Sequence, residues 1–447
     1  MSWGFTSHPS RGGLPAVLAA LFLLSFTACA PTRSGNSPGG VSARPGDERI
    51  SFLLVYMIHG DGDYIYHDAQ GLRRLADEDA LAQAREVAMN APEAEVFIFH
   101  QKPRWHIWSH PSRDGTMFQY RRGTLVREQD YSRRGKGSDF AAEAGLFRKN
   151  ALPRHLPPKS CLAKDGSAKG DTNRGPDRFF VYFGHEIPAL GGRGYSHSRP
   201  KEEFSLPDFA RGVERFAGPP CAPNHPLSVL ALSSCYGGTP ATTATLFPFA
   251  DFLLASPTPL HLSFLDTRAL IPLMREESAG PGPGPAEVEP DGWRAGLVRA
   301  RVEQMAQESF TRLQGRTQTA ISIALYESER ASDYLMAHSG PWDADGELGD
   351  EVRMAPMGYQ DCGEDAGFGP GGEEAGVQVY YQAAKFGALR SKSAHSGWSC
   401  PSSSSRAASA HPAEAAGSLT APPSVEGRLG ELPVDSEDVD WDPVMRP

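Results

Sequence analysis

The stretch "LSVLALSSCYGG", Leu227 to Gly238, decides the fold and raises the question of function. Its first part is apolar on both faces, which is typical of a central strand in a parallel sheet covered by helices. The run then stops at Cys235, between small residues and before two glycines. A core strand has no need of sulfur at its end, so Cys235 is a packing residue, half of a disulfide or a nucleophile.

Similar apolar runs recur along the chain and alternate with segments of helical periodicity. Asp77, Ser205 and Thr239 each stand where a helix N-cap is expected, and Pro240 follows Thr239 as the first helical residue. Such alternation predicts an α/β fold, in which helices cover a mostly parallel sheet. The expected strands are Ile50–Ile58, Ala94–Gln101, Arg178–Gly184, Leu227–Ser234, Phe252–Ser256 and Thr319–Glu327.

The architecture expected from these segments is a doubly wound sheet of about six strands with flanking helices. Trp105 to Glu128 alternates between apolar and polar residues, which predicts a small β-hairpin insertion outside the main sheet. We expect one domain over residues 49–400, with a Pro/Gly loop at 281–290, and a disordered acidic tail at 401–447.

Composition excludes one class of partner. The 447 residues carry a formal net charge of −10, and 40% of them are hydrophobic, as in a globular protein with a sizeable core. The richest basic run, Arg121 to Gly137, is interrupted by acids. Because nucleic-acid binding needs clustered Lys and Arg on one face, we expect no nucleic-acid partner. We expect a monomer.

The N-terminal segment is typical of export. Arg11 precedes the apolar run Leu14 to Ala28, which has the length of a signal peptide and is too short for a stable membrane span. The run ends in "FTAC", which resembles the bacterial lipobox and implies cleavage before Cys29 and a lipid on its sulfur. An ordinary signal peptide cut near Ala28 is the alternative. We expect a signal peptide at 1–28, a tether at 29–48 and a location in the bacterial cell envelope.

The number of cysteines indicates one reactive thiol. Without Cys29, five cysteines remain, and an odd number in an exported protein flags a free thiol. If Cys235 is that thiol, the other four allow three pairings. If the strands that follow them are parallel neighbours, Cys161 and Cys221 lie in loops at the amino-terminal edge of the sheet, away from Cys235, and we expect them to pair. Cys362 and Cys400 are then expected to pair by elimination.

The ends of two neighbouring strands are expected to bring a histidine and a cysteine together. The strand at Arg178–Gly184 ends at His185, and the next ends at Cys235. Ligands bind beyond the carboxyl ends of the strands in an open parallel sheet, so the imidazole and the thiol are expected to meet there. The imidazole increases the thiolate fraction, and the backbone N–H groups of Cys235 and Glu186 are placed to bind an oxyanion.

These residues carry a family resemblance. An apolar strand ending in His, a helix, and a strand ending in "SSCYGG" resemble the caspase-like cysteine peptidases. "HEIPALGGRGYSHS" and "FLLVYMIHGDGD" are more similar to the clostripain family, and the resemblance covers Ile50 to Glu327. It implies a caspase-like fold and a cysteine endopeptidase that cleaves peptides or proteins through a thioacyl-enzyme.

The chain departs from that family at two positions. Glu186 stands where a Gly usually follows the His, and Ser233 stands where an Asp that binds basic side chains usually precedes the Cys. The alternatives are therefore an inactive, peptidase-like binding lipoprotein or another thiol hydrolase such as an amidase. Asp61, Asp63 and Asp266 are candidates for substrate binding.

Metal sites have weak support in the sequence. The "HEIPA" stretch lacks the second His of a zinc-protease helix, and the acids after the first strand fail the EF-hand pattern at Ile65. Those acids either line the substrate cleft, bind calcium loosely or form a solvated loop. We expect His100, His106 and His110 to be surface residues of the hairpin, and no required cofactor or structural metal.

Overall fold

The computed structural model describes the following residues: 50–62, 64–68, 70–103, 114–133, 139–157, 176–187, 205–220, 225–276, 290–338, 359–364, 372 and 374–401. All of them belong to one unit of the chain, Arg49–Pro447. None of the helices in these ranges is both long and apolar enough to cross a membrane.

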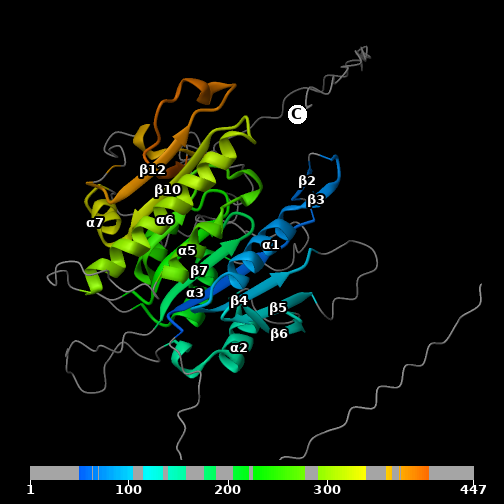
Figure 1. Cartoon of the computed structure of the whole chain (residues 1–447). Helices are drawn as coiled ribbons and strands as arrows, with labels where there is room; N and C mark the ends of the chain where they lie inside the picture. Colours follow the sequence, from blue (N-terminus) through cyan, green and yellow to red (C-terminus); the bar gives the residue numbers. More distant parts are fainter. Residues whose placement is uncertain are drawn as a thin grey trace, which may run out of the picture. The chain divides into compact units, whose positions relative to one another are not determined.

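A nine-stranded sheet organises these residues (Figure 1), in the order β12-β10-β9-β8-β7-β1-β4-β5-β6. The five strands from β9 to β4 are mutually parallel, whereas the two strands added at each side are antiparallel to their neighbours. The strands are β1 Phe52–His59, β4 Ala94–Gln101, β5 Gly115–Arg121, β6 Thr124–Tyr131, β7 Asp177–Phe183, β8 Leu227–Ser233, β9 Ala250–Ala255, β10 Ile321–Glu327 and β12 Val377–Gln382.

The predicted α/β fold with a mostly parallel sheet is confirmed, and each of the six expected strands is present. The sheet has nine strands, however, because edge strands extend it on both sides. The hairpin expected outside the sheet is part of it, since β5 pairs with β4 along its whole length. This pairing satisfies the backbone groups of β4, which would otherwise form an open edge.

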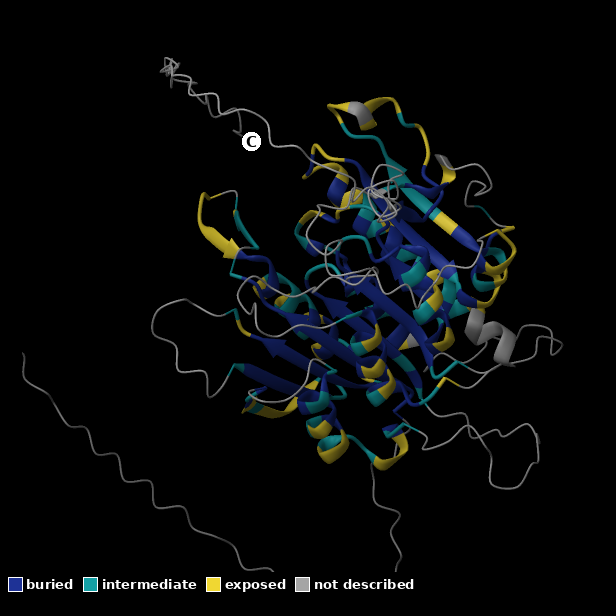
Figure 2. Ribbon diagram, turned by 180° about the vertical axis from the view of Figure 1, so that it is seen from behind, coloured by how far each residue is buried: buried dark blue, intermediate teal, exposed yellow. Residues whose placement is uncertain are grey.

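Helices cover both faces of the sheet and define two core layers (Figures 1 and 2). Alternate residues of β1 face opposite layers: Leu54 packs in the layer with α1, α5 and α6, and Val55 packs in the layer with α2, α3, α4 and α7. The α-helices are α1 Ala76–Met89, α2 Ala141–Asn150, α3 Leu206–Ala217, α4 Pro240–Leu246, α5 Leu270–Glu276, α6 Pro290–Gln314 and α7 Ser328–His338.

Short elements complete the fold. The pair β2 Ile65–His67 and β3 Arg73–Leu75 forms a ribbon after β1, and β11 Tyr359–Asp361 pairs with β13 Ser399–Pro401. The 3₁₀ helices are η1 Pro153–His155, η2 Phe247–Phe249, η3 His261–Ser263, η4 Thr267–Ala269, η7 Cys362–Glu364 and η8 Ala388–Ser391.

The helix starts agree with the sequence in two cases and differ in one. Ser205 caps α3 in a capping box with Asp208, and Thr239 caps α4 with Pro240 at its first turn. Asp77 was expected to cap α1, but it lies inside the first turn. Its buried carboxylate pairs instead with His100 Nε2 at 2.8 Å, an interaction that only tertiary packing provides.

A disulfide joins Cys362 to Cys400 and is part of the core. This is one of the two pairings expected from the sequence; Cys161 and Cys221 lie outside the described residues. The cross-linked segment touches the turn that follows β8, because Ser399 N donates a hydrogen bond to Gly238 O at 3.1 Å.

Candidate active site

Three adjacent parallel strands end at the candidate site. In the register of the sheet, Ile58 of β1 pairs with Phe183 of β7, and Phe183 pairs with Ser233 of β8. His185 and Cys235 therefore each stand two residues beyond paired positions, at the carboxyl ends of neighbouring strands. The edge of the sheet that the sequence indicated does carry both residues.

Asp61, which follows β1, holds the imidazole of His185. His185 Nε2 forms a hydrogen bond with the Asp61 carboxylate, and the Asp61 side chain is fully buried, whereas that of His185 is 21% exposed. A buried carboxylate in this position fixes the orientation of the ring. Asp61 was expected to bind substrate, whereas in the structure its carboxylate binds the imidazole of His185.

The thiol of Cys235 is held by a loop that follows β9. Leu260 N donates to Cys235 Sγ at 3.3 Å, and the thiol donates to Leu260 O at 3.6 Å. Burial raises the pKa of the thiol above its usual value, and the charge of Glu186 raises it further. Hydrogen bonds from Leu260 and Tyr64 lower it by less. The thiol is therefore protonated at neutral pH in this structure.

Tyr64 connects the thiol and the imidazole. Its ring lies against the ring of His185, with a centroid distance of 4.2 Å, and its hydroxyl group interacts with the Cys235 thiol. Ser263 Oγ lies 3.4 Å from the same hydroxyl. Sequence reasoning missed Tyr64; the available signal was an aromatic residue directly after the acidic loop that follows the first strand.

Unusual backbone conformations gather around the thiol. Five non-glycine residues in the described part of the chain have positive φ, and three of them are Tyr236, Leu262 and Ser263. Left-handed backbone is costly for such residues and is often found at functional sites. The turn is also tightly enclosed, because a Cβ on Gly238 would lie 2.5 Å from the Tyr326 hydroxyl.

The two backbone groups expected to bind an oxyanion lie on the turns that carry Cys235 and His185. Within the described residues, the N–H of Cys235 donates to no other group. Glu186 directly follows His185 and is partly exposed. The Cys235 N–H thus remains available at the end of β8.

Other sequence candidates have different surroundings. The Asp266 carboxylate is buried and forms ion pairs with Arg268 and Arg312, each at 2.7 Å, so its charge is already compensated. Asp63, Cys29, His106 and His110 lie outside the described residues. His100 was expected on the hairpin surface but is buried at the end of β4.

In the part of the chain that is described, no three His, Cys, Asp or Glu residues are grouped so that they could hold a metal ion.

Comparisons with known proteins give distant structural likenesses, and those described below are all at low sequence identity. No protein-family model matches the chain, and no curated protein matches it significantly. One of these likenesses is to a secreted C11 cysteine protease from Bacteroides thetaiotaomicron in complex with an irreversible peptide inhibitor. Its sequence identity to this chain is 10% and its TM-score is 0.38, and the match covers 65% of this chain and 69% of that chain. A further structure of a secreted C11 protease from that organism is 9% identical with a TM-score of 0.39, over the same shares.

The third solved structure is an inactive zymogen C11 protease from Parabacteroides distasonis. It is 13% identical, with a TM-score of 0.44, over 78% of this chain and 91% of that chain. Similarity at this level shows nothing about the chemistry of the present chain.

Proposed function

We propose that the chain is a lipid-anchored, extracytoplasmic cysteine endopeptidase in which Cys235 is the nucleophile and His185 the general base. The observation that carries the proposal is the convergence of Asp61, His185 and Cys235 at the ends of three adjacent parallel strands. Nucleophile, base and a third group that orients the base are the parts that acyl transfer requires.

The reaction follows from these positions. His185 takes the proton of the thiol, and the Cys235 thiolate attacks the carbonyl carbon of the peptide bond. The Cys235 N–H donates to the oxygen that becomes negative. When the C–N bond breaks, the imidazolium gives its proton to the leaving amine and a thioacyl-enzyme remains. His185 then takes a proton from water, which attacks the thioester and releases the acid and the free thiol.

Asp61 supports both proton transfers. Because its carboxylate binds Nε2, the Nδ1 atom of His185 is the nitrogen that exchanges protons with the sulfur. The negative charge of Asp61 stabilises the imidazolium that forms when the thiol ionises. This stabilisation offsets part of the cost of ionising a buried thiol whose pKa is raised.

The proposed location rests on the N-terminal sequence. The basic start, the apolar run from Leu14 to Ala28 and Cys29 in the "FTAC" stretch support export, cleavage and lipid attachment. A single lipidated cysteine would hold the domain at the surface of a membrane in the bacterial envelope.

One observation favours a second function, that of an inactive peptidase-like binding protein. Burial and Glu186 both raise the pKa of the Cys235 thiol, which opposes formation of the nucleophile. The two functions make opposite predictions about turnover. In the endopeptidase, the protonated thiol is the resting form, and His185 removes its proton when substrate binds.

A peptide-library digest separates the two functions. The full chain and its Cys235→Ala variant would be incubated with the same library, and new termini would be identified by mass spectrometry. The endopeptidase produces new termini that are absent with Cys235→Ala. Identical digests, or no new termini with either protein, would contradict the proposal and favour the binding protein.

A further inference from the structure

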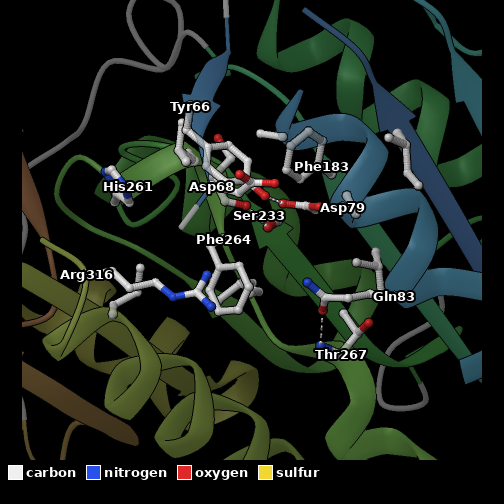
Figure 3. Close-up of a pocket in the computed structure, with 18 of the residues that line it drawn as sticks. Tyr66, Asp68, Asp79, Gln83, Phe183, Ser233, His261, Phe264, Thr267 and Arg316 are labelled. Carbon is white, nitrogen blue, oxygen red and sulfur yellow. Dashed lines mark hydrogen bonds between the residues drawn. The ribbon is translucent and has the colours of Figure 1, made fainter. Parts of the chain in front are cut away.

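A large cavity opens beside the candidate site (Figure 3). Its volume is about 1290 Å³, and it lies on the α1 and α6 face of the sheet at the carboxyl ends of β1, β7 and β8. Side chains from these elements and from the loop after β9 form its walls, among them Tyr56, Ala80, Phe183, Ser233, Phe264 and Leu313.

The cavity shares a wall with the thiol. Ser233, which lines the cavity, is two residues before Cys235, and its hydroxyl group donates to Ser263 O. The segment from His261 to Ser263 also lines the cavity, and it directly follows Leu260, the residue that binds the Cys235 sulfur. A side chain of a substrate bound at Cys235 therefore has this cavity within reach.

The walls are mainly apolar and aromatic. Ile58, Phe183, Phe264 and Leu265 give the cavity faces on which a ring can pack. Figure 3 shows Phe183 and Phe264 from different sides of it. The volume exceeds what an alanine or serine side chain would fill, so a small side chain would leave much of the apolar surface in contact with water.

Two residues of this lining carry hydroxyl groups that are buried away from the cavity surface. Tyr56 and Thr267 are 2% and 5% exposed, and their hydroxyl groups interact with each other. Beyond that interaction, neither hydroxyl has a hydrogen-bond partner among the described residues. Both hydroxyl oxygens are shielded from solvent, so they offer no accessible polar contact to a ligand and leave the apolar character of the cavity unchanged.

The acidic groups of the cavity are already partnered. Asp68 pairs with Arg74 at 2.8 Å and accepts a hydrogen bond from Leu72 N at 2.9 Å. Asp79 accepts a hydrogen bond from the hydroxyl of Tyr66. The charges of Arg74 and Arg316 act on the Tyr66 hydroxyl beside Asp79, so the two carboxylates are balanced by two arginines in or beside the lining. A basic side chain would therefore lose its hydration without gaining a net negative charge, which is unfavourable.

The basic groups do not create a site for an acidic side chain either. Arg316 lies over the ring of Phe264, with its guanidinium carbon 5.5 Å from the ring centroid, and it is exposed to solvent. Burial and the charge of Arg316 lower the pKa of His261, so this imidazole is neutral at pH 7. With Asp68 and Asp79 in the same lining, the cavity offers no concentrated positive charge.

We propose that this cavity binds the side chain of the substrate residue that precedes the cleaved bond, and that it selects a large uncharged side chain, above all an aromatic one. The proposal rests on the proposed function and names its substrate class. The absence of a carboxylate at Ser233 is part of the same selection, since this residue lines the cavity without charge.

Binding to the inactive full chain tests the proposal without relying on turnover. Five peptides, acetyl-Ala-Ala-Ala followed by Phe, Tyr, Lys, Asp or Ala as the C-terminal amide, would be titrated calorimetrically into the Cys235→Ala variant. We expect the Phe and Tyr peptides to bind at least about tenfold more tightly than the other three. Tightest binding of the Lys or Asp peptide, or no binding of any peptide, would overturn the proposal.

A matched pair of variants places the binding in the cavity. Ala80 lines the cavity, and Ala82 on the same helix is exposed and does not. In the Cys235→Ala background, Ala80→Trp should abolish the preference for Phe and Tyr, whereas Ala82→Trp should keep it. Equal effects of the two substitutions would show that the aromatic residue binds elsewhere. Failure of the proposed function is distinct, since it would appear as intact peptides in the wild-type digest whatever these titrations show.

Discussion

Asp61 and His185 lie on the ends of neighbouring parallel strands, and the buried Asp61 carboxylate accepts a hydrogen bond from His185 Nε2. Asp61→Asn should therefore lower kcat by about 10²- to 10⁴-fold with little change in KM, because an amide neither fixes the same tautomer nor stabilises the imidazolium. Steady-state kinetics on a cleaved peptide measures the effect.

A second Asp–His pair supplies the control for Asp61. Asp251 Oδ1 lies 3.0 Å from His225 Nδ1, at the amino ends of β8 and β9, on the opposite edge of the sheet. Asp251→Asn should leave kcat within about twofold of wild type. Equal losses in both variants would show that Asp61 acts through general stability.

Tyr64 should tune the acidity of the thiol. Its hydroxyl group interacts with Cys235 and lowers the thiol pKa, against the larger raising effect of burial. Tyr64→Phe removes that interaction, so the pKa should rise further and alkylation at neutral pH should slow. The rate of iodoacetamide labelling of the Cys235 peptide, followed against pH by mass spectrometry, gives the inflection.

The direction of the pH dependence is fixed by the raised pKa. The rate of labelling of wild-type Cys235 should increase with pH, and its inflection should lie above the pKa of an ordinary thiol, which is about 8.5. Tyr64→Phe should move this inflection to a higher pH. Tyr66→Phe is the control, since the Tyr66 hydroxyl binds Asp79. A downward movement in Tyr64→Phe would contradict the role assigned to this residue.

How much the sequence predicted depended on the kind of signal. The apolar runs predicted both ends of β4, Ala94–Gln101, and the first residue of β8, Leu227. They could do so because a strand buried on both faces has a continuous apolar pattern. The hairpin pattern could not reveal that β5 pairs with β4, since alternation specifies faces and not neighbours. The partner of Asp77 was equally hidden, because His100 reaches it only in the folded sheet.

The candidate site was predictable where it follows strand ends. His185 and Cys235 were placed at one edge of the sheet from chain order alone, because consecutive parallel strands end on the same side. Tyr64 and Leu260 come from loops without periodicity, so no sequence pattern placed them against the thiol. The role of Asp61 as partner of the imidazole also required the fold.

The disulfide between Cys362 and Cys400 should support the domain near the site. Replacing both cysteines by serine removes a covalent loop with a sequence separation of 38, which should lower the free energy of unfolding by about 2–4 kcal/mol. Urea unfolding followed by circular dichroism measures this. An unfolding free energy equal to that of wild type would mean that the cross-link carries no stability.

Lipid attachment at Cys29 is testable in the producing bacterium. Cys29→Ser should abolish incorporation of a labelled fatty acid and release the protein from the membrane fraction, because the sulfur is the proposed attachment atom. Cys235→Ser is the matched control and should label as wild type. Undiminished labelling of Cys29→Ser would contradict the proposed anchor.

The central claim is that Cys235 and His185 act as one catalytic unit. It is tested most directly by measuring kcat/KM on one cleaved peptide for wild type, Cys235→Ala, His185→Ala and the double variant. Circular dichroism shows whether each variant is folded. We predict that each single substitution lowers kcat/KM by at least about a thousandfold and that the double variant is no worse than Cys235→Ala, since groups that act together fail together. Full activity of either folded single variant, or losses that multiply in the double variant, would contradict the account.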